Sequence, residues 1–278
     1  MAIAGLRGRE LVLDSDQGAG EDKPLLQVEH VKICYQLQHQ VVTAVSDVSF
    51  EMGRHERLML IGPSGCGKST LLKAVAGFLY PEAGTIRFDG RTNLTPGPDR
   101  AVVFQEFDQL FTWRTVLGNV AYPLRVIGYS RQEAVERARD FIDMIGLAEA
   151  ANRYPHQLSG GMKQRVAIAR ALALKPVMLL MDEPFGSLDA ITRARLQREL
   201  KRIADETKVA VLFVTHSIQE AMTLGDRIVV FGPPPSQVLA VVDVRDLKGP
   251  EDPRYIELQS NLHKLLGAGD EELHGVEG

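Results

Sequence analysis

Apolar and polar residues alternate over two stretches near the start of the chain, Leu26–Tyr35 and Val45–Phe50. A period of two is typical of half-buried strands, so these stretches predict an antiparallel pair. Arg57–Ile61 is a short, mostly apolar run that predicts a buried strand, and Thr85–Phe88 predicts a strand that ends in the hairpin signal Asp89-Gly90. The first part of the chain is therefore expected to be rich in strands.

Later runs are apolar throughout instead of alternating. Val177–Met181 and Val209–Val214 have this character, which is typical of central parallel strands covered by helices on both faces. Ala101–Phe104 predicts a further strand, and Asp226–Val230 with Val238–Val242 predicts a last strand pair. Because no apolar run approaches the roughly eighteen residues of a membrane span, no segment is expected to cross a bilayer.

Helical periodicity fills the intervals between these strands. Ser130-Arg-Gln-Glu133 is a capping box, and apolar residues on one helical face follow it. Ser159 is suited to cap the run of helix formers at Lys163–Leu174, which Pro176 stops. Further helices are predicted after residues 62–67, after Asp189 and over Pro253–Leu266.

The composition is that of an ordinary globular chain. Of 278 residues, 45% are hydrophobic and 24% are charged, and the formal net charge of −4 offers no broad basic surface for nucleic acid. The N-terminus lacks the apolar core of a secretory signal, and Cys34 and Cys66 lack the spacing of a zinc site. The chain is therefore expected to stay in the cytosol with reduced thiols.

The stretch from Gly62 to Thr70, Gly-Pro-Ser-Gly-Cys-Gly-Lys-Ser-Thr, matches the phosphate-loop pattern G-x-x-x-x-G-K-[ST]. It lies between a predicted strand and a predicted helix, which is the context that the pattern requires. Glycines let backbone N–H groups converge on an anion, and the helix N-terminus adds positive potential. Lys68 is expected to reach the β- and γ-phosphates of a nucleotide, and the Ser69 hydroxyl to hold Mg²⁺. The alternative is a glycine-rich turn without a ligand.

Polar residues follow three of the predicted buried strands. Gln105 follows the first, Asp182 and Glu183 follow the second, and His216 follows the third. In open α/β sheets ligands bind at the carboxyl ends of strands. One carboxylate is therefore suited to support Mg²⁺ and the other to act as base on a water molecule, whereas the alternative for each group is a solvated loop or a structural role.

Two glycines behind the capping Ser159 leave backbone N–H groups exposed at a helix N-terminus. This arrangement suits a second phosphate, and a plain capped helix is the alternative.

Cys66 lies inside the phosphate loop, next to the predicted helix N-terminus. The positive end of a helix lowers the pKa of a thiol. The resulting hypothesis is a reactive Cys66 whose alkylation blocks nucleotide binding.

Taken in order, these motifs resemble the ATP-binding cassette (ABC) superfamily, specifically the ATPase subunits of bacterial importers for nitrate, taurine and alkanesulfonates. The resemblance covers residues 28–242, and its most specific part is Leu158-Ser-Gly-Gly-Met162 ahead of the acidic strand end Asp182-Glu183. Met162 stands where Gln is commoner, and Thr112 stands where Pro is frequent. Neither departure touches the chemistry, but both leave the transported solute open.

The resemblance implies a role for each motif residue. The implied catalytic residues are Glu183 as general base, His216 on the γ-phosphate and attacking water, and Lys68 on the phosphates. The implied Mg²⁺ site comprises Ser69, Gln105 and Asp182. The implied ATP contacts of one subunit are Tyr35 on adenine and Gly62, Pro63, Ser64, Gly65, Cys66, Gly67, Lys68, Ser69, Thr70 and Gln105. The other subunit would cap the same nucleotide with Ser159, Gly160 and Gly161, with Asp189 at the interface.

The resemblance also implies the fold and its domains. The expected class is α/β, a P-loop NTPase core with a parallel sheet, an antiparallel β subdomain and an inserted helical subdomain. Residues 1–24 would be a flexible extension, and residues 25–245 the ATPase domain. Within that domain the core would comprise residues 25–105 and 156–245, and the helical subdomain would comprise residues 106–155. Residues 246–278 would form a C-terminal helix and tail.

The implied partners are a second ATPase subunit, as a homodimer or with a close paralogue, and transmembrane permease subunits. A periplasmic solute-binding protein would act indirectly, no nucleic acid is expected, and the chain would lie peripherally at the cytoplasmic face of the bacterial inner membrane. Four aromatic residues surround Gln105, namely Phe104, Phe107, Phe111 and Trp113. They either pack in the core or form a groove for a short helix of the permease.

Two other functions compete with transport. A cassette ATPase that acts on nucleic acid or ribosomes would carry coiled-coil insertions or tandem cassettes, and the sequence shows no internal repeat and no sustained heptad. A small-molecule kinase with a phosphate loop would leave Ser159–Gly161 and His216 without a role. Import of a small solute, such as an anion, is therefore the leading hypothesis.

Overall fold

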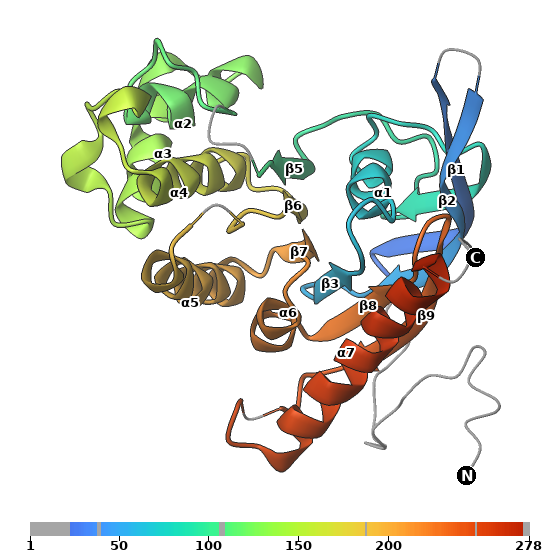
Figure 1. Cartoon of the computed structure of the whole chain (residues 1–278). Coiled ribbons are helices and arrows are strands. Elements are labelled where there is room, and N and C mark those ends of the chain that lie inside the picture. Colours follow the sequence, from blue (N-terminus) through green and yellow to red (C-terminus); the bar gives the residue numbers. More distant parts are fainter. Residues whose placement is uncertain (1–22, 38–39, 106–108, 187, 248, 275–278) are drawn as a thin grey trace. The chain divides into compact units, whose positions relative to one another are not determined.

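The computed structural model describes residues 23–37, 40–105, 109–186, 188–247 and 249–274. The chain divides into two compact units, whose elements Figure 1 labels. Met1–Pro96 and Leu212–Gly278 together make the first unit, and Gly97–Val211 makes the second unit. The predicted helical insertion at 106–155 falls inside the second unit, and its exact bounds stay a prediction.

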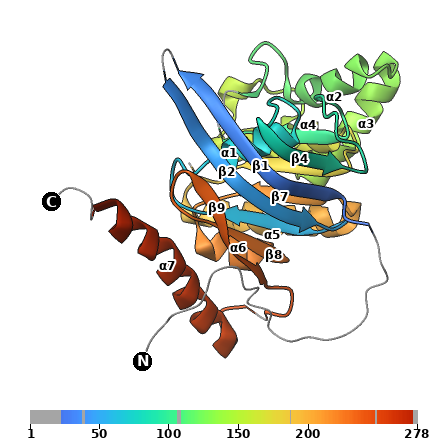
Figure 2. The same ribbon diagram turned by 90° about the vertical axis from the view of Figure 1, so that its right-hand side faces the viewer.

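Strands dominate the first unit, where they follow the order β4-β1-β2-β9-β8-β3. β1 (Leu26–Leu37) and β2 (Gln40–Met52) are antiparallel, which confirms the predicted pair, and Figure 2 shows them as two long strands side by side. β4 (Ala83–Phe88) pairs with β1 on its other edge and begins two residues earlier than predicted. This antiparallel layer therefore follows directly from local alternation.

The remaining strands of the first unit join its two chain segments, Met1–Pro96 and Leu212–Gly278. β8 (Arg227–Phe231) and β9 (Ser236–Asp243) form the predicted antiparallel pair, and β8 also pairs in parallel with β3 (Arg57–Ile61). β9 continues into a parallel pairing with β2 through Val45 and Ser236. No local sequence pattern predicted this last pairing, because it joins segments about 190 residues apart.

Among its described residues, the first unit has three helices. α1 (Lys68–Val75) follows β3, and α6 (Ile218–Leu224) follows β7. α7 (Pro253–His274) extends beyond the predicted 253–266 and packs against α6 and β8, where Tyr255, Leu258 and Leu262 are buried.

The second unit contains three strands in the order β7-β6-β5, and the boundary between the units falls within β7 (Ala210–Val214). β5 (Arg100–Val103) and β6 (Met178–Asp182) are parallel, with Val103 opposite Met181. Because paired parallel strands end at the same edge, this register fixes which loop residues meet beyond them.

Helices make up the rest of the second unit. They are α2 (Val116–Val126), α3 (Arg131–Met144), α4 (Gly160–Leu172) and α5 (Ala190–Thr207), with short 3₁₀ turns at Ala148–Ala150 and Pro155–Gln157. The predicted capping box opens α3. The Ser130 hydroxyl accepts a hydrogen bond from the Glu133 N–H at 3.2 Å, and the Glu133 carboxylate accepts one from the Ser130 N–H at 2.9 Å. Ser159 caps α4, again as predicted.

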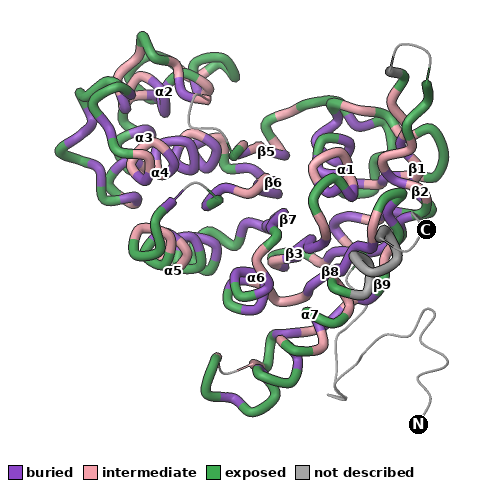
Figure 3. Tube along the Cα trace, in the orientation of Figure 1, coloured by how far each residue is buried: buried purple, intermediate pink, exposed green. Residues whose placement is uncertain are grey.

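The core of each unit lies along its apolar strands, which Figure 3 shows as buried segments. β7 is buried at every position, and β3, β6 and β8 at four positions of five. The continuous apolar runs of the sequence therefore correspond to strands covered on both faces, and the architecture is α/β. Among the described helices, none combines the length and the apolar character that a bilayer span requires.

Candidate functional site

The phosphate-loop sequence connects β3 to α1, as the pattern requires. Gly65 and Gly67 adopt left-handed backbone conformations with φ of 78° and 95°. A Cβ on Gly67 would lie 2.4 Å from the Ala44 carbonyl oxygen, and one on Gly62 would lie 2.8 Å from the Cβ of Phe231. Gly67 is restricted to glycine by both its left-handed backbone and its contact with β2, whereas Gly62 is restricted by its contact with β8 and Gly65 by its left-handed backbone.

Lys68 carries a buried positive charge in the middle of this loop. The residue is only 5% exposed. Its Nζ donates hydrogen bonds to the carbonyl oxygens of Gly62 at 2.9 Å and Pro63 at 2.8 Å. The ammonium is thereby held over the loop backbone at the N-terminus of α1. Such a fixed charge beside a helix N-terminus suits an anion with several oxygens.

Tyr35 is tied to the far end of the same loop. Its half-buried side chain donates a hydrogen bond from the phenol to Thr70 Oγ1 at 3.1 Å. The sequence assigned Tyr35 to adenine, and that role stays a prediction. The structure brings β1 and the start of α1 together through this bond.

The environment of Cys66 contradicts the hypothesis of a reactive thiol. Cys66 is completely buried, and this burial raises the pKa of its thiol, against the opposing effect of Lys68, whose Nζ lies 3.6 Å from Sγ. The proposed lowering of the pKa by the helix N-terminus is therefore wrong. Desolvation of the thiolate outweighs the nearby positive charge.

We expect N-ethylmaleimide to modify Cys34 in the native chain and to leave Cys66 unmodified until the chain unfolds. Because its pKa is raised, the Cys66 thiol stays mainly protonated at pH 8. Its thiolate forms only at a pH above the usual pKa range of cysteine. Mass spectrometry of a Cys34→Ser protein, labelled before and after denaturation, isolates Cys66. Rapid labelling of the native variant would contradict the expectation.

In the second unit, strand register brings Gln105 and Glu183 together. Val103 of β5 pairs with Met181 of β6, so residues two positions further along each strand emerge side by side. Gly186 lies between them, since a Cβ there would be 3.3 Å from Gln105 Nε2 and 3.9 Å from Glu183 Oε2. An amide and a carboxylate therefore share one small space at the carboxyl edge of the strands.

Glu183 occupies an unusual backbone conformation. Its φ is 43°, in the left-handed region that non-glycine residues rarely adopt, and Gly186 N–H closes the following turn onto the Glu183 carbonyl at 3.2 Å. Asp182 is the last residue of β6, and both acids are half-buried. Strained residues of this kind concentrate at functional sites, because the surrounding structure must hold them in place.

Ser159–Gly161 begins α4. The Ser159 hydroxyl accepts from the Met162 N–H at 3.4 Å, and the serine itself is exposed. A Cβ on Gly161 would lie 2.5 Å from Thr192 Cγ2 of α5, so this glycine also permits close packing of the two helices. The structure thus gives Gly161 a packing role that the sequence did not indicate.

Asp189 caps α5. Its carboxylate accepts from the N–H groups of Ile191 at 3.1 Å and Thr192 at 3.0 Å, and the bond from Thr192 is the main reason that the pKa of Asp189 lies below its usual value. The side chain is exposed. Its predicted place at a subunit interface stays a prediction.

His216 follows β7 in the first unit and is exposed. The preceding Thr215 is buried and donates to Glu220 Oε2 at 2.6 Å, while the Ser217 N–H donates to Thr215 Oγ1 at 3.0 Å. This anchor fixes the turn that presents the histidine. The sequence did not single out Thr215 or Glu220, because their pairing has no local pattern.

The predicted site residues thus fall into two groups. The first unit holds Tyr35, Gly62–Thr70 and His216, and the second unit holds Gln105, Ser159–Gly161, Asp182, Glu183 and Asp189. Each group is arranged by the contacts within its own unit.

Side chains that no sequence motif indicated hold the residues from Gln109 onward in place. The Gln109 amide donates to the Phe104 carbonyl at 2.8 Å, and Arg170 of α4 donates to the Gln109 carbonyl at 2.7 Å. Asn119, fully buried in α2, donates to the carbonyls of Phe111 and Arg114 and accepts from the Phe111 N–H. These bonds fix Gln109, Phe111 and Arg114 in the described part of the connection between β5 and α2.

The aromatic residues of this loop are only partly in the core. Trp113 is 71% exposed, and its ring lies 5.4 Å from the half-buried ring of Phe111, which in turn lies 5.0 Å from Tyr122. Phe104 is half-buried, and Phe107 lies outside the described residues. The exposed end of the cluster, at Trp113, favours an interface over pure core packing.

Comparisons with known proteins agree with this geometry. The family described as ABC transporter matches residues 45–186. A taurine import ATP-binding protein of Rhizobium johnstonii is 42% identical over 87% of this chain and 96% of its own length. A nitrate import ATP-binding protein of Synechococcus elongatus is 42% identical over 80% of this chain and 84% of its own length. A solved dimeric ATP-binding cassette in a post-hydrolysis state with ADP and Pi has 33% identity and a TM-score of 0.70, covering 80% of this chain and all of that one.

Proposed function

The chain belongs to the ABC transporter family, and from this premise we propose that it is the ATP-hydrolysing subunit of a membrane importer for a small anionic solute. The observation that carries the ATPase assignment is the phosphate loop in which Lys68 Nζ is already held over two loop carbonyls. Relatives named for the import of taurine and nitrate support import of a solute such as nitrate, taurine or an alkanesulfonate.

The first unit supplies the groups that bind the triphosphate. The left-handed glycines turn backbone N–H groups toward the phosphates, and Lys68 neutralises charge on the β- and γ-phosphates. Tyr35 is proposed to stack on adenine, its ring oriented by the bond to Thr70. His216, exposed beyond β7, is proposed to hold the γ-phosphate and the attacking water.

The donor set proposed for Mg²⁺ fits a hard cation, because Ser69, Gln105 and Asp182 all offer oxygen atoms. When bound, the ion neutralises charge on the β- and γ-phosphate oxygens. The described residues contain no cluster of three or more His, Cys, Asp and Glu side chains, so the protein would hold the ion together with nucleotide oxygens instead of in a cage of its own.

Glu183 is proposed as the general base. Its carboxylate lies beside the Gln105 amide, near where Gly186 leaves space, and can take a proton from a water molecule that the amide orients. The left-handed backbone at Glu183 turns the chain at the end of β6. Gln105 thereby links the chemistry to the loop that carries Phe111 and Trp113.

A second subunit is proposed to complete the site. The N-terminus of α4 at Ser159–Gly161 offers a second anion cap within a chain that already has a phosphate loop. In the proposed head-to-tail dimer this cap closes on the nucleotide of the partner, and Asp189 lies near the interface. The solved dimeric cassette with ADP and Pi supports such an assembly, formed with an identical subunit or a close paralogue.

Permease subunits are the proposed membrane partners, with a periplasmic solute-binding protein acting through them. The chain would then lie peripherally on the cytoplasmic face of the membrane. The alternative of a cassette ATPase that acts on nucleic acid or ribosomes has less support, because the relatives are import proteins and the net charge is −4.

A Trp113→Ala protein is expected to assemble with its membrane partner at least about tenfold more weakly, since an interfacial tryptophan typically contributes ~2 kcal/mol or more. Phe111→Ala should act in the same direction, because it removes the ring against which Trp113 packs. Binding of ATP should be unchanged in both. The measurement is the fraction of tagged chain that copurifies with the permease from detergent-solubilised membranes.

Phe78→Ala is the matched control, because Phe78 is an aromatic residue 50% exposed in the first unit. Its assembly should equal that of the unchanged chain. If no membrane-spanning protein copurifies with the unchanged chain, the import function is wrong, and if both loop variants assemble normally, the docking role of this loop is wrong.

A further inference from the structure

The turn that carries His216 is closed by hydrogen bonds on both sides of the histidine. Thr215, directly before it, donates from Oγ1 to Glu220 Oε2 at 2.6 Å. Ser217, directly after it, donates from its backbone N–H to Thr215 Oγ1 at 3.0 Å and accepts at Oγ from the Glu220 N–H at 3.2 Å. The Thr215 hydroxyl therefore joins the end of β7, which precedes His216, to α6, which follows it.

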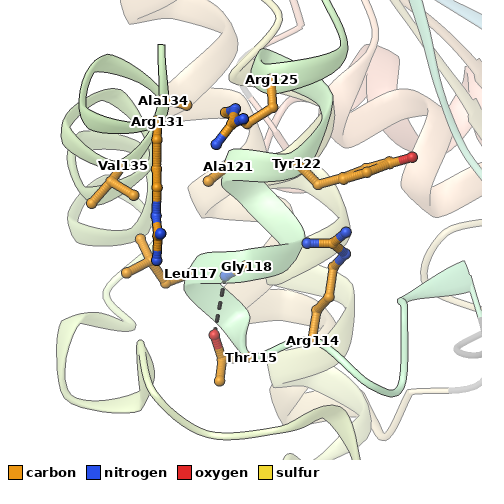
Figure 4. Close-up of a pocket in the computed structure, with 10 residues that line it drawn as sticks. All are labelled: Arg114, Thr115, Leu117, Gly118, Ala121, Tyr122, Arg125, Arg131, Ala134 and Val135. Atoms are coloured by element: carbon orange, nitrogen blue, oxygen red, sulfur yellow. Dashed lines mark hydrogen bonds between the residues drawn. The ribbon is translucent and has the colours of Figure 1, made fainter. Parts of the chain in front are cut away.

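Two helices of the second unit have caps that are purely local. At α2 the Thr115 hydroxyl accepts from the Gly118 N–H at 3.1 Å, beside the pocket lined by α2 and α3 that Figure 4 shows. At α3 Ser130 and Glu133 bond to each other within an exposed turn. Each of these caps joins residues three positions apart, so it stabilises the start of its own helix.

The cap of α6 reaches beyond its own helix. Ser217 and Glu220 have the spacing of a capping box, in which the glutamate side chain accepts from the N–H of the capping serine. Here that N–H donates to the Thr215 hydroxyl, which in turn donates to the glutamate. Glu220 is only 7% exposed, and burial of a carboxylate costs free energy that an exposed capping box avoids. We therefore assign the carboxylate to holding Thr215 as well as to capping the helix.

Thr215 is also bonded to the strand that leads into the phosphate loop. Its N–H donates to the Leu60 carbonyl at 3.1 Å, and Leu60 lies two residues before Gly62. Thr215 is buried, so water competes little for these bonds, whereas His216 beside it is exposed. The backbone that carries the histidine is thus fixed relative to β3 and to the first residue of the phosphate loop.

We propose that Thr215 and Glu220 are positioning residues for His216, which hold its imidazole where it meets the γ-phosphate and the attacking water. This inference rests on the proposed function, in which His216 has that role, and adds the two residues that set its position. Both are buried while His216 is exposed, so they act through the histidine instead of on the nucleotide. Their loss should lower kcat and leave the affinity for ATP to Lys68 and the phosphate loop.

A Thr215→Val protein keeps the shape of the side chain and loses the hydroxyl. Its kcat for ATP hydrolysis should fall about tenfold, because a small displacement of a reacting group is costly, and its affinity for ATP should be unchanged. Thr215→Ser keeps the hydroxyl and should stay within about twofold of the unchanged chain. Thr223→Val is the matched control, since Thr223 is an exposed threonine of α6 that donates to the Gln219 carbonyl, and its kcat should be unchanged.

Variants of Glu220 test the other side of the same bond. Glu220→Gln keeps an oxygen that can accept from the Thr215 hydroxyl and should stay within about twofold of the unchanged chain, whereas Glu220→Leu should match Thr215→Val. The combined Thr215→Val/Glu220→Leu protein should show the same loss of about tenfold, because both changes break one bond network. If Thr215→Val alone does not fold, the combined protein carries the test, since apolar replacement of both partners leaves no buried unpaired carboxylate.

A network that only caps α6 would give a different result. The melting temperature would then fall while kcat stays normal in Thr215→Val, or in the combined protein, and this outcome overturns the proposal. Separate losses that multiply to about a hundredfold in the combined protein overturn the pairing. In a His216→Ala protein, adding Thr215→Val should change the residual hydrolysis of radioactive ATP by less than about twofold, and a further tenfold fall would show that the threonine does not act through the histidine.

Hydrolysis by the unchanged chain separates this inference from the proposed function. No hydrolysis by the unchanged chain overturns the ATPase assignment and this inference together. Normal hydrolysis by the His216→Ala protein overturns the role of His216 and this inference, and leaves Lys68 and Glu183 in their proposed roles. A normal kcat in the combined Thr215→Val/Glu220→Leu protein overturns the positioning role alone, and the ATPase function stands.

Discussion

ATP hydrolysis by a Glu183→Gln protein is expected to fall about 1,000-fold, within the range of roughly 10²–10⁴ for loss of a general base, while ATP binding is retained. Glutamine keeps the size and shape of the side chain beside Gln105 and Gly186, so the left-handed turn should persist. It cannot accept a proton from water. The effect should therefore appear in kcat and not in the affinity for ATP.

Unhydrolysed ATP should hold the Glu183→Gln subunits together as a stable dimer. Size-exclusion chromatography with and without ATP measures this state, and radioactive ATP measures the nucleotide retained in it. Glu206→Gln is the control, because Glu206 is an exposed glutamate of α5 paired with Arg202. Hydrolysis near the normal rate by the Glu183→Gln protein would reject the assigned base, and phosphoryl transfer from ATP to a small acceptor by the unchanged chain would favour a kinase.

A Lys68→Ala protein is expected to bind ATP about 100-fold more weakly, since hydrogen bonds to charged groups contribute up to ~3 kcal/mol each. The lysine ammonium is buried and held by the carbonyls of Gly62 and Pro63, so it is positioned before any nucleotide arrives. Its removal takes away the charge that meets the phosphates and also the donor to both carbonyls. Calorimetric titration with ATP measures the loss.

Lys73→Ala is the matched control for this change. Lys73 lies in the last turn of the same helix, α1, and is exposed, so its removal should leave the affinity for ATP unchanged. Lys68→Arg should not restore binding, because the larger planar group does not fit a site with 5% exposure. Near-normal ATP affinity in Lys68→Ala would show that the loop does not bind phosphate through this residue.

Local sequence patterns determined the elements of this protein and the kind of ligand it binds. Alternation predicted the β1 and β2 pair, and continuous apolar runs predicted β3, β6 and β7, because strand period and burial are read from neighbouring residues. The capping box at Ser130 and the cap at Ser159 depend on residues within one turn. The phosphate loop is also a local pattern, because its glycines and Lys68 lie within nine consecutive residues.

Only the tertiary structure decided the environment of these groups. The burial that raises the pKa of Cys66 is set by the packed loop as a whole, and the space at Gly62 is limited by Phe231, far along the chain. Parallel register between β5 and β6 placed Gln105 beside Glu183. Desolvation and strand pairing depend on distances between residues remote in sequence, which periodicity and local motifs do not encode.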